Sequence, residues 1–175
     1  MDESTTAQWQ QILVETMDFE QGTADRILAM LASLEDLTVG FAVNQLVHSL
    51  QTATRAEEAG AGTDVIVASL CHDIGKAVSV SNHPRIAAEI LRPYVRAEVV
   101  SMISAHQDFQ GRHYYEYFDL SPNAREQYRG EPWYALAEQF ADDWDQTSFD
   151  PDYPTHSLEH FEPMVREVFA STRII

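Results

Sequence analysis

The sequence predicts an all-α fold. Apolar residues recur at three- and four-residue spacing along most of the chain, and no run alternates apolar and polar residues over the length of a strand. Residues that commonly cap helices flank these periodic segments: Thr23, Thr63, Asn82 and Ser157 at starts, and Gly60 and Gly75 at ends. We expect helices at about residues 6–17, 24–34, 41–58, 63–73, 83–91, 95–107, 132–147 and 157–171.

Composition favours one soluble domain spanning residues 1–175. Hydrophobic residues make up 45% of the 175, enough for a sizeable core, and no repeat or flexible linker divides the chain. A single cysteine, Cys71, excludes an internal disulfide framework and is best interpreted as a small buried hydrophobe in a reducing compartment. The N-terminus lacks the basic and apolar regions of a signal peptide, and no apolar run reaches the length of a membrane span. We therefore expect a cytoplasmic protein.

The net charge limits the classes of partner. A formal charge of -17 at pH 7 disfavours binding to nucleic acid, because its phosphates would be repelled. The same charge disfavours anionic membrane surfaces. A small-molecule substrate remains the favoured partner.

The stretch Leu70 to Lys76 places His72 and Asp73 side by side where a buried helix ends. The preceding segment, 63–71, is apolar almost all round, as expected for a helix inside the core. A carboxylate at a helix C-terminus meets the negative end of the helix dipole, and an unpaired buried carboxylate costs several kcal/mol. Asp73 therefore needs a positive partner, which is either Lys76 or a metal cation.

Three other histidines are candidate ligands. His48 lies in a polar seam of helix 41–58 whose amide and hydroxyl neighbours suit an outer coordination shell. His83 begins helix 83–91, where a surface position is the alternative. His106 continues the apolar line of Val95, Val99 and Met102 and faces inward, as a ligand or as a core histidine.

A second carboxylate comes from helix 132–147. The small residues Ala137 and Ala141 lie on one line with Asp145, which leaves room for a bound group; Asp142 is the rival ligand. Four imidazoles and two carboxylates suit two first-row metal ions, with Asp73 able to bridge them, whereas a catalytic zinc site usually has three protein ligands. The candidate set is His48, His72, Asp73, His83, His106 and Asp145.

The segment Gln107–Glu131 is the least regular part of the sequence. It holds Gly111, Pro122, Gly130 and a cluster of aromatic residues around Tyr117. A long irregular connection of this kind is uncommon unless it is functional. We expect either a substrate-covering lid or a plain surface excursion.

These residues resemble the HD-domain superfamily, whose pattern of His, His-Asp and a later Asp binds metal in a helical fold. The two additional histidines are similar to the dinuclear subgroup. Five stretches resemble the HD-domain di-iron oxygenases that cleave organophosphonates, relatives of myo-inositol oxygenase. They are residues 44–51, 72–75, 82–83, 120–122 and 144–151, within a metal-binding core of about 41–151.

The resemblance implies a ligand assignment and an activity. One iron would bind His48, His72, Asp73 and Asp145, and the other would bind His83, His106 and the bridging Asp73. A mixed-valent Fe(II)/Fe(III) pair would use O2 to oxidise a hydroxylated small molecule at the carbon that bears the hydroxyl group. The chemistry would belong to the metals, and the protein would supply geometry and exclude water.

The sequence also departs from the phosphonate-cleaving members. Thr38 and Phe41 stand where these have a gating tyrosine and glutamate, and Asp142-Asp143 stand where they have paired arginines. Gln110 replaces a lysine, so basic anion clamps have become neutral or acidic. Substrate contacts are expected at Lys76, Gln110, Arg112, Ser121 and Asp142, with Lys76 also a catalytic candidate. A neutral or cationic hydroxylated substrate is at least as consistent with these residues as a phosphonate.

Two alternatives stay open. The same ligands with manganese, iron or another divalent ion could activate water against a phosphate ester or nucleotide, and His-Asp-Ile-Gly-Lys also occurs in hydrolytic relatives. A metal-stabilised binding domain without catalysis is the other. The block Asn44–Gln51 together with Trp144-Asp145 favours the oxygenase.

Overall fold

The structure is a computed structural model that describes residues 1–170, and it confirms the all-α fold: this part of the chain contains eight α-helices and no strand. The helices are α1 (Thr6–Gln21), α2 (Thr23–Ser33), α3 (Gln45–Glu58), α4 (Thr63–Cys71), α5 (His83–Leu91), α6 (Ala97–Gln110), α7 (Tyr134–Gln139) and α8 (Leu158–Phe169). Within the described residues, no helix combines the length and apolar character needed to cross a bilayer.

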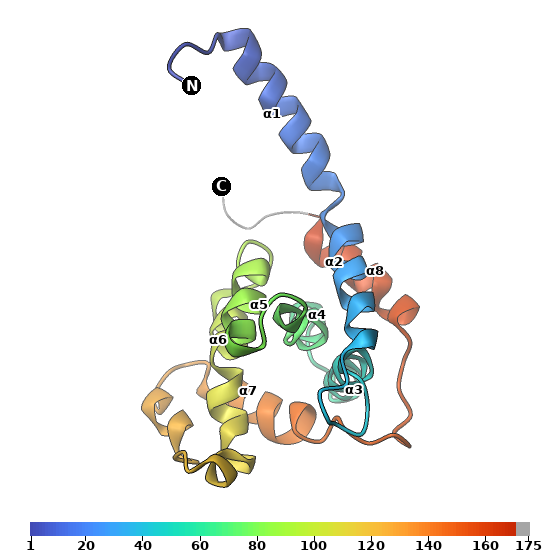
Figure 1. Cartoon of the computed structure of the whole chain (residues 1–175), viewed down its shortest axis with the longest axis vertical. Coiled ribbons are helices and arrows are strands. Elements are labelled where there is room, and N and C mark those ends of the chain that lie inside the picture. The colour runs from blue at the N-terminus through green and yellow to red at the C-terminus, as the bar shows by residue number, and fades with distance from the viewer. Residues whose placement is uncertain (171–175) are drawn as a thin grey trace.

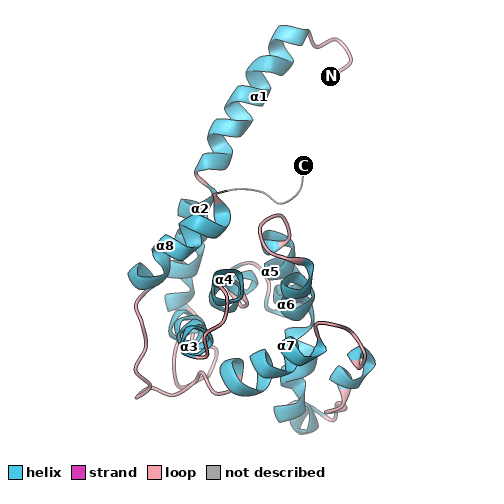
Figure 2. Cartoon of the chain, turned by 180° about the vertical axis from the view of Figure 1, so that it is seen from behind, coloured by secondary structure: helices cyan, strands magenta, loops and turns pink. Residues whose placement is uncertain are grey.

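The bundle is arranged around α4. Every residue from Val65 to Cys71 is buried, as the apolar sequence of this segment predicts. In Figures 1 and 2, α4 lies at the centre with α3, α5, α6 and α8 around it. Burial raises the pKa of Cys71 to about 12, so its thiol is a neutral core group, as expected.

Helix α1 differs from the other helices because none of its residues is buried. It projects from the end of the bundle beyond α2 (Figure 1). The first helix that contributes to the core is therefore α2, through Ala24, Ile27 and Leu31.

Several expected boundaries were wrong by a few residues. Helix α3 begins at Gln45 rather than 41, because the Asn44 side chain accepts a hydrogen bond from the backbone N–H of Val47 (2.9 Å) and caps the helix. Val39 and Gly40, with φ of 43° and 86°, form a turn just before it. Thr23 and Thr63 begin their helices, whose N-cap positions fall on the preceding glycines. Helix α8 ends at Phe169, and residue 171 of the expected helix lies outside the described residues.

The expected helix 132–147 is present over residues 134–145, but it is not α-helical throughout. After α7, the chain forms a wider π-helical segment, Phe140–Asp145, closed by a hydrogen bond from the N–H of Gln146 to the carbonyl of Ala141 (3.1 Å). Such segments often occur at functional sites because they change where the following side chains lie. Asp145 is the last residue of this one.

The segment 107–131 is irregular, as predicted, except that α6 extends through Gln110. It contains three short 3-10 turns, Gly111–His113, Tyr115–Phe118 and Ala124–Tyr128. The buried Arg125 fixes the last turn by donating two hydrogen bonds, each 3.0 Å, to the carboxylate of Asp142.

Candidate metal centre

Six candidate ligands from five segments converge in the interior. None of them is more than 5% exposed. His48 comes from α3, His106 from α6 and Asp145 from the π-helical segment, while His72 and Asp73 follow α4 and His83 begins α5. The set is His48, His72, Asp73, His83, His106 and Asp145.

Backbone carbonyls orient all four imidazoles in the same way. Each Nδ1 lies 2.7–2.8 Å from a main-chain oxygen: His48 from Ser148, His72 from Ser69, His83 from Val80 and His106 from Ile103. A carbonyl oxygen can only accept a hydrogen bond, so in each neutral imidazole Nδ1 carries the proton and Nε2 keeps its lone pair. This arrangement orients a histidine to bind metal through Nε2.

The cluster has two sides, which the two oxygens of Asp73 join. Oδ2 lies 3.4 Å from Nε2 of both His48 and His72. Oδ1 faces the other way, 3.1 Å from Nε2 of His83 and 3.7 Å from that of His106. Asp145 belongs to the first side, with its Oδ1 3.2 Å from His48 and 3.5 Å from His72. The geometry matches two adjacent cation positions bridged by one carboxylate.

The protein atoms alone leave these ligands unsatisfied. Within the described residues, Asp73 Oδ1 and Asp145 Oδ2 are buried without a hydrogen-bond partner. Nε2 of His48 lies 3.0 Å from Nε2 of His72, and the corresponding distance between His83 and His106 is 3.2 Å. Buried carboxylate oxygens without a partner are costly, and a divalent cation would satisfy them together with the nearby Nε2 atoms. The residues therefore fit a metal centre of imidazole and carboxylate ligands.

The pKa values of the buried carboxyl groups and of His72 also favour a bound cation. Burial acts to raise the pKa of Asp73 and Asp145, but the neighbouring histidines hold both pKa values well below the usual range for a carboxyl group. Burial acts to lower the pKa of His72, but Asp73 and Asp145 raise it to about 10. The two carboxylates thus create a field that favours positive charge at this position. A bound cation would meet the same field.

Gly75 holds the two sides of the centre together. Its backbone is not in the left-handed region, so the predicted role as a helix stop is wrong. A Cβ atom at this position would lie 2.7 Å from the Cα atom of His83 and 3.0 Å from its carbonyl carbon. Glycine is needed here because the backbone of His83 packs directly against it. The close approach places the first residue of α5 beside Asp73.

Polar side chains support the ligands from outside, as the seam on α3 predicted. The Gln51 amide donates to the carbonyl of Asp150 (2.6 Å) and so fixes the segment that carries the Ser148 carbonyl. Lys76 donates to Asp73 Oδ2 and to Gln45 Oε1 (2.8 Å). Lys76 is therefore the salt-bridge partner of Asp73 in this structure.

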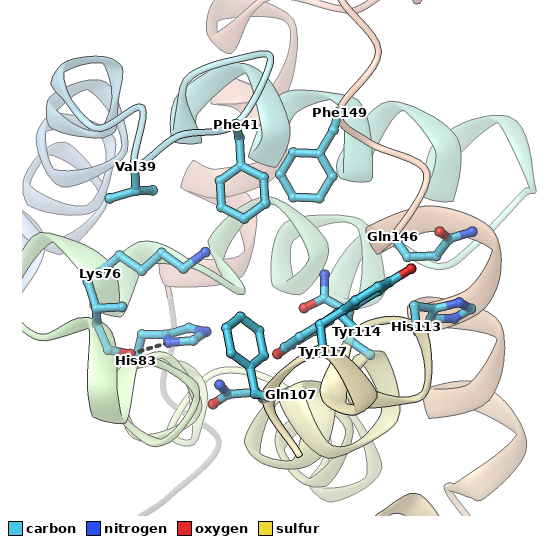
Figure 3. A pocket seen from close by; sticks show the side chains of 13 residues that line it. Val39, Phe41, Lys76, His83, Gln107, His113, Tyr114, Tyr117, Gln146 and Phe149 are labelled. Carbon is cyan, nitrogen blue, oxygen red and sulfur yellow. Dashed lines mark hydrogen bonds between the residues drawn. The ribbon is translucent and has the colours of Figure 1, made fainter. Parts of the chain in front are cut away.

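A cavity of about 630 Å³ lies beside the centre. His83 and Lys76 line it on the metal side, and Figure 3 shows both across the cavity from Tyr114 and Tyr117. Phe41 and Phe149 lie together at another wall (Figure 3), with ring centroids 4.5 Å apart. The size is that of a site for a small organic molecule.

The structure brings some expected substrate contacts to this cavity and not others. Lys76 and Gln110 line it, and Gln110 also donates to Asp145 Oδ1 (2.9 Å). Arg112 and Ser121 are exposed and are not among the described residues that line the cavity. Asp142 is likewise absent from that lining and is bound by Arg125 and by His113 (2.9 Å). Asp145, not its rival Asp142, reaches the buried cluster.

Sequence reasoning missed much of the cavity wall. The contacts expected from the sequence do not include His113, Gln146 or Phe149, which all line the cavity. Phe149 stacks on the His48 ring with centroids 4.1 Å apart, but it lies in an irregular segment that has no periodic pattern. The available signal was the aromatic cluster near Tyr117, for which a substrate-covering lid and a plain surface excursion had both been expected.

Comparison with protein families matches the HD domain over residues 46–150, which is more than half of the chain. The chain belongs to the HD-domain family. The match covers most of the predicted core, 41–151, and the buried His/Asp cluster is the feature expected of a metal-dependent HD domain. It does not separate the subgroups, so the resemblance to the di-iron oxygenases stays a prediction. A search of curated proteins finds no match.

A separate group of potential ligands lies at the surface of the protein. Glu57, His156 and His160 offer ligand atoms close to one another, and His160 Nε2 lies 2.8 Å from Glu57 Oε2. Neither histidine is among the ligands expected from the sequence, and both are exposed. The contact links α8 to α3.

Proposed function

We propose that this HD domain is a dinuclear metalloenzyme, and specifically a mixed-valent di-iron oxygenase that acts on a hydroxylated small molecule. The observation that supports it most is the division of Asp73 between two ligand groups, with His48 and His72 at one oxygen and His83 and His106 at the other. When bound, an Fe(II)/Fe(III) pair would supply the redox chemistry with O2; manganese or another divalent ion is the alternative.

The proposed roles of the protein groups follow from their positions. His48, His72 and Asp145 would hold one ion, His83 and His106 the other, and Asp73 would bridge them. Gln110 would orient the substrate from the cavity side, because its amide already lies against Asp145. Lys76, which donates a hydrogen bond to Asp73, would contact the substrate hydroxyl or its oxidised product. The aromatic wall would exclude water.

The cavity lining favours a substrate of low negative charge. Among the described residues that line it, Lys76 is the only lysine or arginine, and it is paired with Asp73. A phosphate or phosphonate group usually requires several donors or a bidentate arginine. A neutral or cationic hydroxylated molecule avoids this requirement, in agreement with the altered anion clamp.

The second candidate function is metal-dependent hydrolysis of a phosphate ester. Two observations favour it: the family match is to HD domains, a superfamily of metal-dependent hydrolases, and Lys76 places one ammonium group beside the centre. The same two metal positions could activate water. The scarcity of cationic side chains in the cavity weighs against it.

Parallel assays with one preparation separate the two functions. Protein loaded anaerobically with Fe(II) and then exposed to O2 should consume oxygen when 1,2-diols or 1-hydroxyalkylphosphonates are added, and Asp73→Asn should abolish this. The same protein loaded with Mn(II) should leave p-nitrophenyl phosphate and bis-p-nitrophenyl phosphate intact. Hydrolysis of either ester without substrate-dependent oxygen consumption would establish the phosphohydrolase instead.

A further inference from the structure

The mouth of the cavity is apolar and open to water. Val39 and Phe41, from the loop before α3, are 58% and 46% exposed, and Tyr117 and Phe118, from the turn after α6, are 86% and 67% exposed. All four line the cavity, and we call them the rim. Exposed apolar groups gathered at the entrance of a cavity indicate a surface that is covered by an apolar ligand.

An aromatic column leads from the rim to the metal centre. The ring of Phe41 stacks on Phe149 with centroids 4.5 Å apart and planes 17° apart. Phe149 in turn stacks on His48 at 4.1 Å and 10°. The stacked rings therefore form an apolar wall that begins at Phe41 on the surface and ends at His48, a candidate metal ligand. A ligand bound at the centre with an apolar extension would lie against this wall.

Unfavourable backbone conformations occur in both rim segments. Val39 has φ of 43° and Asp119 has φ of 55°, and they are the two non-glycine residues of the described chain in the left-handed region. A β-branched residue rarely adopts this conformation. Its presence two residues before Phe41 indicates that the loop is held in a shape that presents apolar side chains at the entrance.

The polar part of the cavity lining is small. Gln107, Gln110 and Gln146 contribute amides, and no aspartate or glutamate is among the described residues that line the cavity. An amide recognises a hydroxyl group without requiring charge. A cationic ligand would gain from the aromatic rings but would find no carboxylate among these lining residues.

We propose that the substrate is amphiphilic, with a hydroxylated head at the metal centre and an unbranched apolar chain of several carbons. The chain lies along Phe41 and Phe149 and leaves the cavity between Val39 and Phe118. The identity of the head rests on the proposed function, whereas the binding of an apolar chain rests on the rim and the column.

Equilibrium binding of straight-chain 1,2-diols tests this inference. Fe(II)-loaded protein kept free of O2 is titrated with the series from three to eight carbons by calorimetry, so that no turnover occurs. Affinity should rise roughly two- to fourfold for each added methylene group, as expected for partial to full burial. An affinity that does not change with chain length would overturn the proposal.

Variants and a charged isostere complete the test. Phe41→Ser and Phe118→Ser should at least halve the slope of the logarithm of the affinity plotted against the number of carbons. Leu13→Ser, at an exposed apolar position of α1, should leave this slope unchanged. Equal effects of all three would contradict a role for the rim, and unchanged thermal melting shows that each variant is folded. Tighter binding of 3-(trimethylammonio)-1,2-propanediol than of its neutral isostere 4,4-dimethyl-1,2-pentanediol would contradict the proposal, because it would mean that the site recognises a cationic group and not an apolar chain.

The outcome is separable from that of the proposed function. Binding that depends on chain length, without oxygen consumption in air, would support the apolar site and contradict the oxygenase. Oxygen consumption with diols of every length, bound with equal affinity, would support the oxygenase and contradict the apolar site.

Discussion

The candidate metal centre and the rim of the cavity differ in how their residues are held. The candidate ligands are buried on or beside helices, and each imidazole is fixed by a backbone carbonyl. The rim residues lie on loops and short turns, are exposed, and include a strained valine. A site that must hold metal ions needs fixed geometry, whereas a site that admits a molecule from solution needs an accessible surface. Substitutions at the ligands should therefore change metal content, whereas substitutions at the rim should not.

The largest expected effect is at the bridge. Asp73→Asn keeps the size of the side chain but removes the charge that both sides of the centre share. We expect bound iron to fall from about two ions per chain to below about 0.3. Metal analysis by mass spectrometry after anaerobic loading measures this. Retention of one full equivalent would mean that Asp73 is not shared.

Gly75→Ala should affect one side of the centre only. The added methyl group would collide with the backbone of His83 and move it away from Asp73. Bound iron should fall from about two ions per chain to about one, with loss of about 1–3 kcal/mol of stability from overpacking. Gly62→Ala is the matched control, because its Cβ would meet only the flexible side chain of Asp64 at 3.3 Å. Loss of both ions, or of neither, would contradict this role for Gly75.

The neighbouring carboxylates of the π-helical segment should respond differently. Asp145→Ala should release the ion held with His48 and His72, because Asp145 is buried between them. Asp142→Ala should retain both ions and instead lose about 2 kcal/mol of unfolding free energy, since the buried Arg125 loses its main partner. Metal analysis and chemical denaturation of both variants are the measurements. The reverse pattern would overturn the assignment of Asp145.

The smallest effect is expected at the rim. Val39→Gly relieves an unfavourable φ, which offsets the entropic cost of glycine, whereas Val78→Gly, at an exposed residue with φ of -111°, incurs only the cost. Val39→Gly should therefore be more stable than Val78→Gly by about 1–2 kcal/mol. Neither should change metal content. Equal stabilities by denaturant unfolding would show that the Val39 loop is not strained.

The contrast between the two sites also explains what sequence could predict. His106 and Asp145 lie on lines of apolar or small residues, so helical periodicity indicated that they face inward. The burial of α4 predicted a positive partner for Asp73, which was either Lys76 or a metal cation. The π-helical segment was not predictable, because wider turns have no simple sequence pattern. The role of Gly75 depends on a contact between two segments and is invisible to local rules. The positions of Phe41 and Phe149 depend on loops in the same way.

The central claim is that Asp73 bridges two metal ions, and electron paramagnetic resonance tests it most directly. Iron-loaded protein that is partly reduced should show the signal of a coupled, mixed-valent Fe(II)/Fe(III) pair, and a bound 1,2-diol should shift it. Asp73→Asn should abolish the signal. A spectrum that contains only isolated Fe(III) in the unmodified protein, at full iron loading, would contradict the bridged centre.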